Sequence, residues 1–214
     1  MRRSNRLSVT LILWFIIYLI LFSRYDFTGW RYLYVRILVD DEYTQSVPDW
    51  EERISQIIEE TSNFYEVRFR IKLVPVSFDF FKARGPKAHY EELIQHDRND
   101  GSEILIGFTG RELITDSGSL SDGITKFFTI QITSQYQNRA NQADLLKHEL
   151  GHLFFAFHRN NSIMDHYGSI IGKEFDNLNW LMVQTFKYRN FGFSKLFYKI
   201  YKKFPTNRVI IKGL

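Results

Sequence analysis

Three histidines and one glutamate lie close together in this chain and form its most reactive group of side chains. Residues 147–158 read KHELGHLFFAFH. On a helix, His148 and His152 lie four residues apart, so they project from one face and can both bind one metal ion. Glu149 lies one residue off that face. Its carboxylate can therefore miss the metal and act as a general base on a water molecule held there.

His158 can join the same metal site only if the helix ends before it. Continuous helix would place His158 about 15 Å from His148. If the chain turns back near Phe155, three protein ligands and one open position result, which is the arrangement of a catalytic zinc. Glu174 and Asp165 are alternative third ligands. The chain has no cysteine, so histidines and carboxylates must bind any metal ion.

The pattern H-E-x-x-H-x-x-F-x-x-H resembles the zinc-binding motif of the metzincin peptidases, H-E-x-x-H-x-x-G-x-x-H. Met164, in the sequence Ser-Ile-Met, resembles the Met-turn of that clan. The resemblance implies one catalytic Zn²⁺ bound by His148, His152 and His158, with Glu149 as the catalytic residue. It also implies that Met164 forms a hydrophobic floor under the metal and is not a ligand.

The resemblance covers residues 31–190 and implies a zinc-dependent endopeptidase. Zinc lowers the pKa of a bound water towards about 7 and polarises the scissile carbonyl, while Glu149 moves the proton. A peptide or protein substrate would pair with an edge strand, which we place around residues 117–124. The alternative is a catalytically silent, zinc-stabilised peptide-binding domain at the membrane surface. A purely structural zinc site, however, has no need of Glu149.

Two positions depart from the metzincin pattern. Phe155 stands where the family has a glycine that turns the chain, and a bulky residue at positive φ costs about 1–2 kcal/mol. A differently built turn is therefore open. In some metzincins a tyrosine two residues after the methionine ligates zinc. In this chain His166 occupies that position and Tyr167 follows, and the sequence leaves the roles of both open.

The elements that must position these residues predict an α+β, zincin-like domain. Apolar patterns predict four strands, at residues 33–39, 67–73, 104–108 and 124–133. Helical periodicity and capping signals predict three further helices, at residues 48–64, 90–95 and 176–188. A Gly- and Ser-rich loop is expected at 110–123, and an N-cap at Asn141 would begin the metal-binding helix. This order predicts a mixed, twisted sheet with an active-site helix, as in metzincins.

Residues 1–26 are expected to form a basic stub and a transmembrane anchor. Three arginines precede the uncharged run at residues 7–22. A helix of roughly 17 residues rises about 25 Å, enough for a thin bilayer. Because no small-residue cleavage site follows, we expect an uncleaved single-pass signal-anchor. The positive charge before the span predicts a cytoplasmic N-terminus and a peptidase domain, residues 27–190, outside the cytoplasm.

The C-terminal tail, residues 191–214, combines aromatic and basic residues. It predicts either an interfacial helix on anionic membrane lipid or a helix packed on its own domain with a solvated basic face. The whole chain is 44% hydrophobic, 17% aromatic and carries a net charge of +4. This composition is typical of a globular protein. Without a recognised nucleic-acid motif, we expect no nucleic-acid partner.

Overall fold

The computed structural model describes residues 29–203, except 83, 86, 89, 99, 116, 135–138 and 166–173. The chain divides into two compact units, residues 1–30 and 31–214. The expected anchor at residues 7–22 lies outside the described residues. Among the helices of the described part, none is long and apolar enough to span a bilayer.

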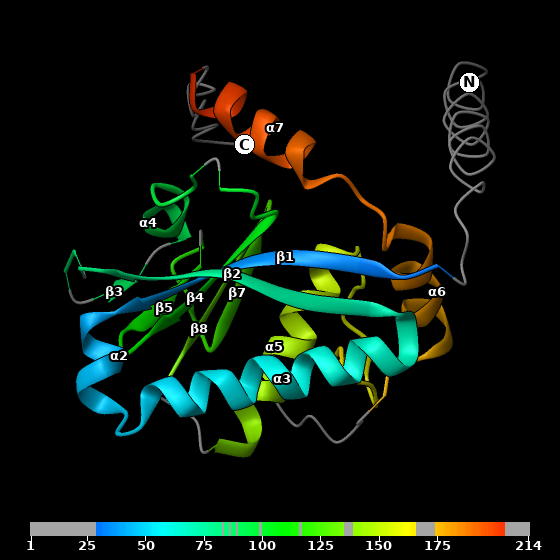
Figure 1. Ribbon diagram of the computed structural model, residues 1–214, viewed down its shortest axis with the longest axis horizontal. Helices are drawn as coiled ribbons and strands as arrows, with labels where there is room; N and C mark the ends of the chain where they lie inside the picture. Colours follow the sequence, from blue (N-terminus) through cyan, green and yellow to red (C-terminus); the bar gives the residue numbers. More distant parts are fainter. Residues whose placement is uncertain are drawn as a thin grey trace, which may run out of the picture. The chain divides into compact units, whose positions relative to one another are not determined.

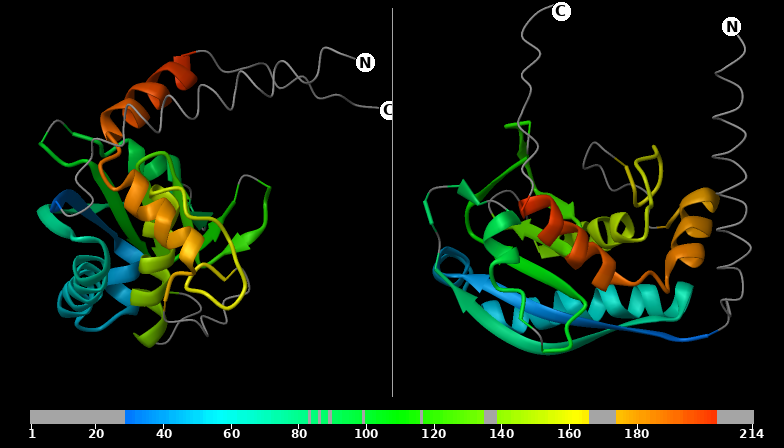
Figure 2. Two further views of the ribbon diagram at one scale, coloured as in Figure 1. Left: turned by 90° about the vertical axis from the view of Figure 1, so that its right-hand side faces the viewer. Right: turned by 90° about the horizontal axis from the view of Figure 1, so that it is seen from above.

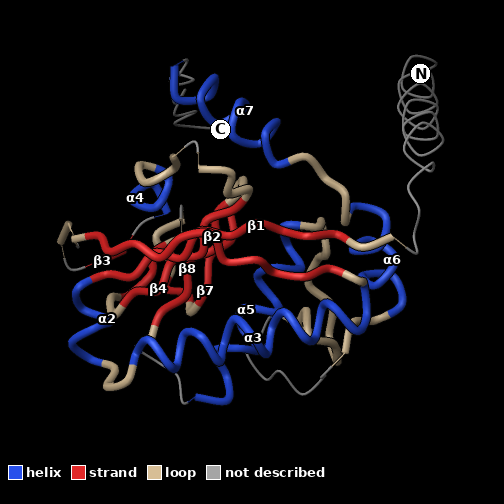
Figure 3. The backbone as a smooth tube through the Cα atoms, viewed as in Figure 1, coloured by secondary structure: helices blue, strands red, loops and turns tan. Residues whose placement is uncertain are grey.

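A five-stranded mixed sheet forms the core of the second unit (Figure 3). Its strands, in spatial order, are β2 (Ile71–Phe81), β1 (Arg31–Asp40), β4 (Ile104–Thr109), β8 (Thr129–Thr133) and β7 (Gly123–Lys126). The first four are parallel, and β7 runs antiparallel to β8 at one edge. Every residue of β4 is buried, as in a parallel strand covered on both faces.

Helices cover both faces of this sheet. They are α2 (Asp41–Ser46), α3 (Trp50–Phe69), α4 (Tyr90–Ile94), α5 (Arg139–Leu153), α6 (Asn177–Phe186) and α7 (Phe191–Lys203). The long helices α3 and α5 pack on one face, and α4 and α7 lie over the other (Figures 1 and 2). Three short strands, β3 (Lys87–Ala88), β5 (Glu112–Ile114) and β6 (Leu120–Ser121), form a second sheet. This mixed α/β structure with a mixed sheet agrees with the class predicted from the sequence.

The strand predicted at 67–73 is wrong at its start. Val67 lies on α3, with 81% of its surface exposed. The chain leaves the helix at Arg70, whose φ of 56° is left-handed, and β2 begins at Ile71. β2 then continues through Pro75, where its register against β1 shifts. Proline is tolerated there because β2 is an edge strand.

Three further expectations also change. The run at 124–133 is two strands, β7 and β8, joined by a turn in which Phe127 has a φ of 58°. The loop expected at 110–123 contains the short strands β5 and β6. Helix α5 begins at Arg139, so Asn141 lies inside the helix and is not its N-cap.

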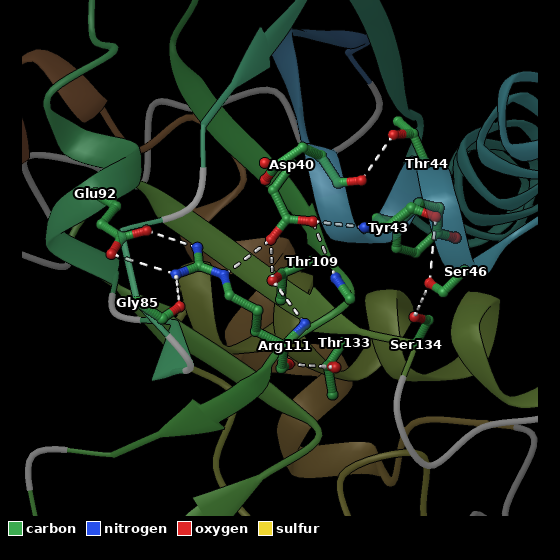
Figure 4. A network of polar contacts seen from close by, with 12 residues as sticks. Asp40, Tyr43, Thr44, Ser46, Gly85, Glu92, Thr109, Arg111, Thr133 and Ser134 are labelled. Atoms are coloured by element: carbon green, nitrogen blue, oxygen red, sulfur yellow. Dashed lines mark hydrogen bonds and ion pairs between the residues drawn. The ribbon is translucent and has the colours of Figure 1, made fainter.

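A buried ion-pair network joins the carboxyl ends of β1 and β4 to the smaller sheet (Figure 4). The side chains of Asp40 and Arg111 are both fully buried, with Oδ2 and Nε 3.1 Å apart. Arg111 Nη2 also lies 2.6 Å from Glu92 Oε2 in α4. Asp40 further accepts the backbone N–H groups of Tyr43 at 2.7 Å and Gly110 at 3.0 Å. The network therefore ties α2, α4 and the start of β5 to the main sheet.

The substitution Asp40→Ala is expected to lower the free energy of unfolding by about 3–5 kcal/mol, because it leaves the buried Arg111 without one of its two anions. Urea unfolding of the purified chain measures this loss. The control is Lys72→Ala, which removes an exposed pair with Glu66 and should cost less than about 1 kcal/mol. Equal, small losses in both variants would contradict the structural role of the network.

Candidate metal centre

Three imidazoles meet at the end of α5. The Nε2 atoms of His148 and His152 are 3.0 Å apart, and that of His158 lies 3.1 Å from His152 and 3.3 Å from His148. Three nitrogens bound tetrahedrally to zinc at about 2.0–2.1 Å would lie about 3.3–3.4 Å from one another. Among the described residues, these three form the group that could hold a metal ion. Their donor atoms and spacing fit Zn²⁺.

Backbone carbonyl groups orient two of these rings. His148 Nδ1 lies 2.8 Å from the carbonyl oxygen of Ile163, and His152 Nδ1 lies 2.8 Å from that of Ala156. When each Nδ1–H donates to its carbonyl, the unprotonated Nε2 faces the other rings. Both neutral imidazoles are therefore oriented to bind a cation. The two carbonyl groups that orient them belong to residues before and after His158 in the chain.

A Schellman turn ends α5 and allows His158 to reach the other two rings. The N–H of Phe155 donates to the His152 carbonyl at 3.0 Å, and the N–H of Ala156 donates to the Gly151 carbonyl at 3.1 Å. Phe155 takes the left-handed conformation, with a φ of 64°. The turn therefore has the positive φ that suits glycine, although a bulky residue occupies it. The structure therefore contradicts the alternative that the chain turns without a positive φ at Phe155.

Packing offsets the strain at Phe155. Its ring lies 4.8 Å, centroid to centroid, from the ring of Phe186 on α6. The guanidinium carbon of Arg189 lies 4.5 Å from the centre of the Phe155 ring. The same guanidinium donates a hydrogen bond to the Leu153 carbonyl at 2.6 Å. Arg189 thus satisfies a carbonyl group at the end of α5. No local pattern indicates this role, since Arg189 and Leu153 lie far apart in the chain.

Met164 is fully buried and packs against α5 at Gly151. A Cβ atom at Gly151 would lie 2.8 Å from the Met164 sulfur, so a larger residue at this point of the helix would force the Met164 side chain to shift. Ser162 Oγ accepts the Met164 N–H at 3.0 Å and tightens the turn. The same turn presents the Ile163 carbonyl to the metal centre. The role of Met164 as a hydrophobic floor under the metal stays a prediction.

The alternative third ligands are placed elsewhere. Glu174 forms an ion pair with Arg68, whose Nε lies 2.6 Å from Glu174 Oε2. Asp165 Oδ2 accepts the N–H of Asn161 at 3.2 Å. Neither carboxylate belongs to the group of possible metal ligands found among the described residues. His166 and Tyr167 lie outside the described residues. The geometry therefore favours His158 over both alternatives.

Glu149 is buried beside the metal centre and faces the edge strand β7. Thr125 Oγ1 lies 2.6 Å from Glu149 Oε2 and 2.9 Å from the Glu149 carbonyl oxygen. Gly123 leaves room for the carboxylate, because a Cβ there would lie 2.6 Å from Glu149 Oε1. Burial raises the pKa of Glu149 to about 7, although the hydrogen bond from Thr125 opposes the rise. A nearby cation would favour the charged form.

Comparisons with known proteins find similar folds but no similar sequence. No protein-family model and no curated protein sequence matches this chain. Solved structures do match. Archaemetzincin from Methanopyrus kandleri superposes with a TM-score of 0.58 at 12% identity, covering 73% of this chain and 96% of its own. A zinc-dependent peptidase from Methanocorpusculum labreanum gives 0.50 at 13% identity, covering 70% and 99%. At these identities the likeness shows a shared fold.

Proposed function

We propose that this chain is a zinc-dependent endopeptidase with Glu149 as its general base. The observation that carries the proposal is the meeting of His148, His152 and His158, whose Nε2 atoms lie 3.0–3.3 Å apart. Three protein ligands leave a tetrahedral ion one open position, whereas structural zinc sites usually have four. A buried carboxylate beside such a site has a use in catalysis. The fold shared with two peptidases supports the same reading.

The chemistry divides between the metal and the chain. A zinc ion bound by the three histidines would supply a Lewis acid for a water molecule and for the substrate carbonyl. Glu149 accepts a proton from the attacking water and delivers it to the leaving amine nitrogen. Thr125 holds Glu149 Oε2 on the β7 side, so the carboxylate enters the reaction in a fixed orientation. No covalent intermediate with the protein is required.

An extended peptide is the substrate that suits this site. β7 lies at the edge of the main sheet and, among the described strands, pairs with β8 alone. A peptide can add to its other side through backbone hydrogen bonds. The strand is at Gly123–Lys126, so it begins near the end of the range 117–124 expected from the sequence. Because Thr125 and Gly123 contact Glu149, a peptide on β7 would pass close to the general base.

The proposal includes a membrane anchor at residues 1–26, with a cytoplasmic N-terminus and the peptidase domain outside. Its support is the sequence alone: three arginines followed by the uncharged run at 7–22. Alkaline carbonate extraction of membranes should leave the full chain in the pellet. Release into the supernatant would contradict the anchor without affecting the zinc-dependent activity.

The rival function is a silent, zinc-stabilised peptide-binding domain. A diverse peptide library separates the two functions when it is incubated with the purified full chain in three states: zinc-loaded, chelated and zinc-restored. We expect new peptide termini, detected by mass spectrometry, in the first and third states. Peptides that bind the zinc-loaded chain and remain intact would instead establish the rival.

The substitution Thr125→Val should lower kcat by about 10–100-fold, the usual effect of removing a side chain that orients a reacting group. Valine keeps the shape and removes the hydrogen bond to Glu149. Thr125→Ser restores the hydroxyl and is the matched control, which should recover most of the rate. Zinc content should be unchanged in both. Wild-type activity in Thr125→Val would show that Glu149 needs no support from β7.

A further inference from the structure

Helix α7 is attached to the domain by one side. Phe191 is fully buried and its ring centroid lies 6.1 Å from that of Phe154. Lys195 Nζ lies 2.5 Å from Asp97 Oδ1 and donates to the Ser102 carbonyl at 2.9 Å. These contacts involve the end of α5 and the segment before β4, so they fix the rotation of α7 about its own axis.

The opposite side of α7 is apolar and exposed. The residues there follow the spacing i, i+3, i+4 and i+7, and are Phe193, Leu196, Phe197 and Ile200, with 72%, 53%, 61% and 48% of their surfaces exposed. This spacing places all four on one helical stripe. A surface helix normally turns its apolar stripe to the core, yet α7 has one apolar side buried and a second one facing outward. Contiguous exposed patches of this kind mark interaction sites.

Positive charge runs along α7 between the outer stripe and the attached side. Lys195, Lys199 and Lys202 follow helical spacing, i, i+4 and i+7, so they form a row along the helix, and Lys199 is the member next to the stripe. Lys195 is paired with Asp97, whereas Lys199 and Lys202 are exposed. α7 contains no acidic residue. The acidic residues that act on α7 lie on other segments: Asp97 pairs with Lys195, and Glu91 of α4 raises the pKa of Tyr198 after the larger effect of burial.

We infer that the outer stripe of α7 inserts into the interface of an anionic lipid bilayer. Phenylalanine, leucine and isoleucine side chains would enter the headgroup and acyl boundary while the lysines contact lipid phosphates. Lysines near an anionic surface add electrostatic attraction to the apolar contact. This inference rests on α7 and is independent of the metal site. The two sequence-based expectations for the tail are not exclusive: α7 packs on its own domain, and the proposal adds lipid contact through its second apolar side.

A second copy of the chain is a poorer partner for this surface. Two α7 helices packed through their outer stripes would bury the apolar residues but would offer the lysines no acidic residue on either helix to pair with. Anionic headgroups supply that missing charge. The bilayer is therefore the occupant that satisfies both the apolar stripe and its basic flank.

The absence of cysteine allows a direct test. In the full chain, Phe193→Cys is labelled with an environment-sensitive fluorophore. The control is Val67→Cys on α3, where the native residue is also highly exposed, 81% against 72% for Phe193. Both are reconstituted in vesicles of phosphatidylcholine alone or of equal parts phosphatidylcholine and phosphatidylglycerol. Residues 1–30 are present in every sample, so any lipid contact they make is common to both labels.

The label at position 193 should become several-fold less accessible to iodide in the phosphatidylglycerol vesicles, and the label at position 67 should not. Lys199→Glu with Lys202→Glu should reverse most of that protection while zinc content stays unchanged. The inference is overturned if both labels remain equally accessible in anionic vesicles. It is also overturned if protection at position 193 depends on protein concentration without lipid, since that would identify a second copy as the partner.

Discussion

Replacing Glu149 with glutamine is expected to abolish peptide cleavage and to leave zinc bound. Glutamine has nearly the shape of glutamate, so it should fit the space beside Gly123 and still accept the hydrogen bond from Thr125. It cannot take a proton from water at neutral pH. We therefore expect the cleavage rate to fall by about 10²–10⁴-fold. The measurement is the initial rate on the best library peptide, with zinc per chain determined on the same samples.

The matched control for this variant is Glu174→Gln, the same chemical change in a carboxylate that pairs with Arg68 at the surface. Its activity should stay close to that of the wild type. If Glu149→Gln also retains activity, Glu149 is not the general base. If Glu149→Gln loses its zinc together with its activity, then Glu149 belongs to the metal-binding group and the assigned role is wrong.

The second large effect is expected from His158→Ala, which should weaken zinc binding by about 10²-fold or more, since each ligand carries a substantial share of the binding free energy. Zinc at about 1,000 times its Kd adds about 4 kcal/mol to wild-type stability, and the variant should lose most of this gain. Competition with a chromogenic chelator measures the affinity, and the zinc-dependent rise in Tm measures the stabilisation.

Two variants test the alternative ligands in the same assay. Glu174→Ala and Asp165→Ala should each bind zinc with nearly wild-type affinity, because neither carboxylate lies in the histidine group. A loss of affinity in either that equals or exceeds the loss in His158→Ala would mean that the third ligand has been assigned wrongly.

The chemistry of the site could be predicted because most of it is local. His148, Glu149 and His152 lie on one helix, and helical spacing alone places them. His158 reaches the other two histidines only because the chain turns at Phe155, and phenylalanine disfavours the left-handed conformation of that turn. Phe155 takes the left-handed conformation, and Phe186 and Arg189, which are distant in sequence, pack against its ring. Such tertiary compensation leaves no signal in the local sequence.

The missed start of β2 had a local signal. Buried residues on α3 continue with helical spacing through Phe64 and Tyr65 to Phe69, although Val67, Phe69 and Ile71 also alternate as a strand would. The two periods overlap at Phe69, and the exposed Val67 shows that the helical period holds there. Such patterns do not predict contacts between distant residues. Thr125 is the clearest case, since its partner Glu149 lies on another element.

Zinc-dependent cleavage is measured by titrating zinc into the metal-free full chain and following peptide cleavage at each step. We expect the rate to rise in proportion to bound zinc and to level off at one ion per chain, while Glu149→Gln binds the same amount of zinc and stays at background. Full occupancy by one zinc without cleavage, or cleavage by the metal-free chain, would contradict the proposed function.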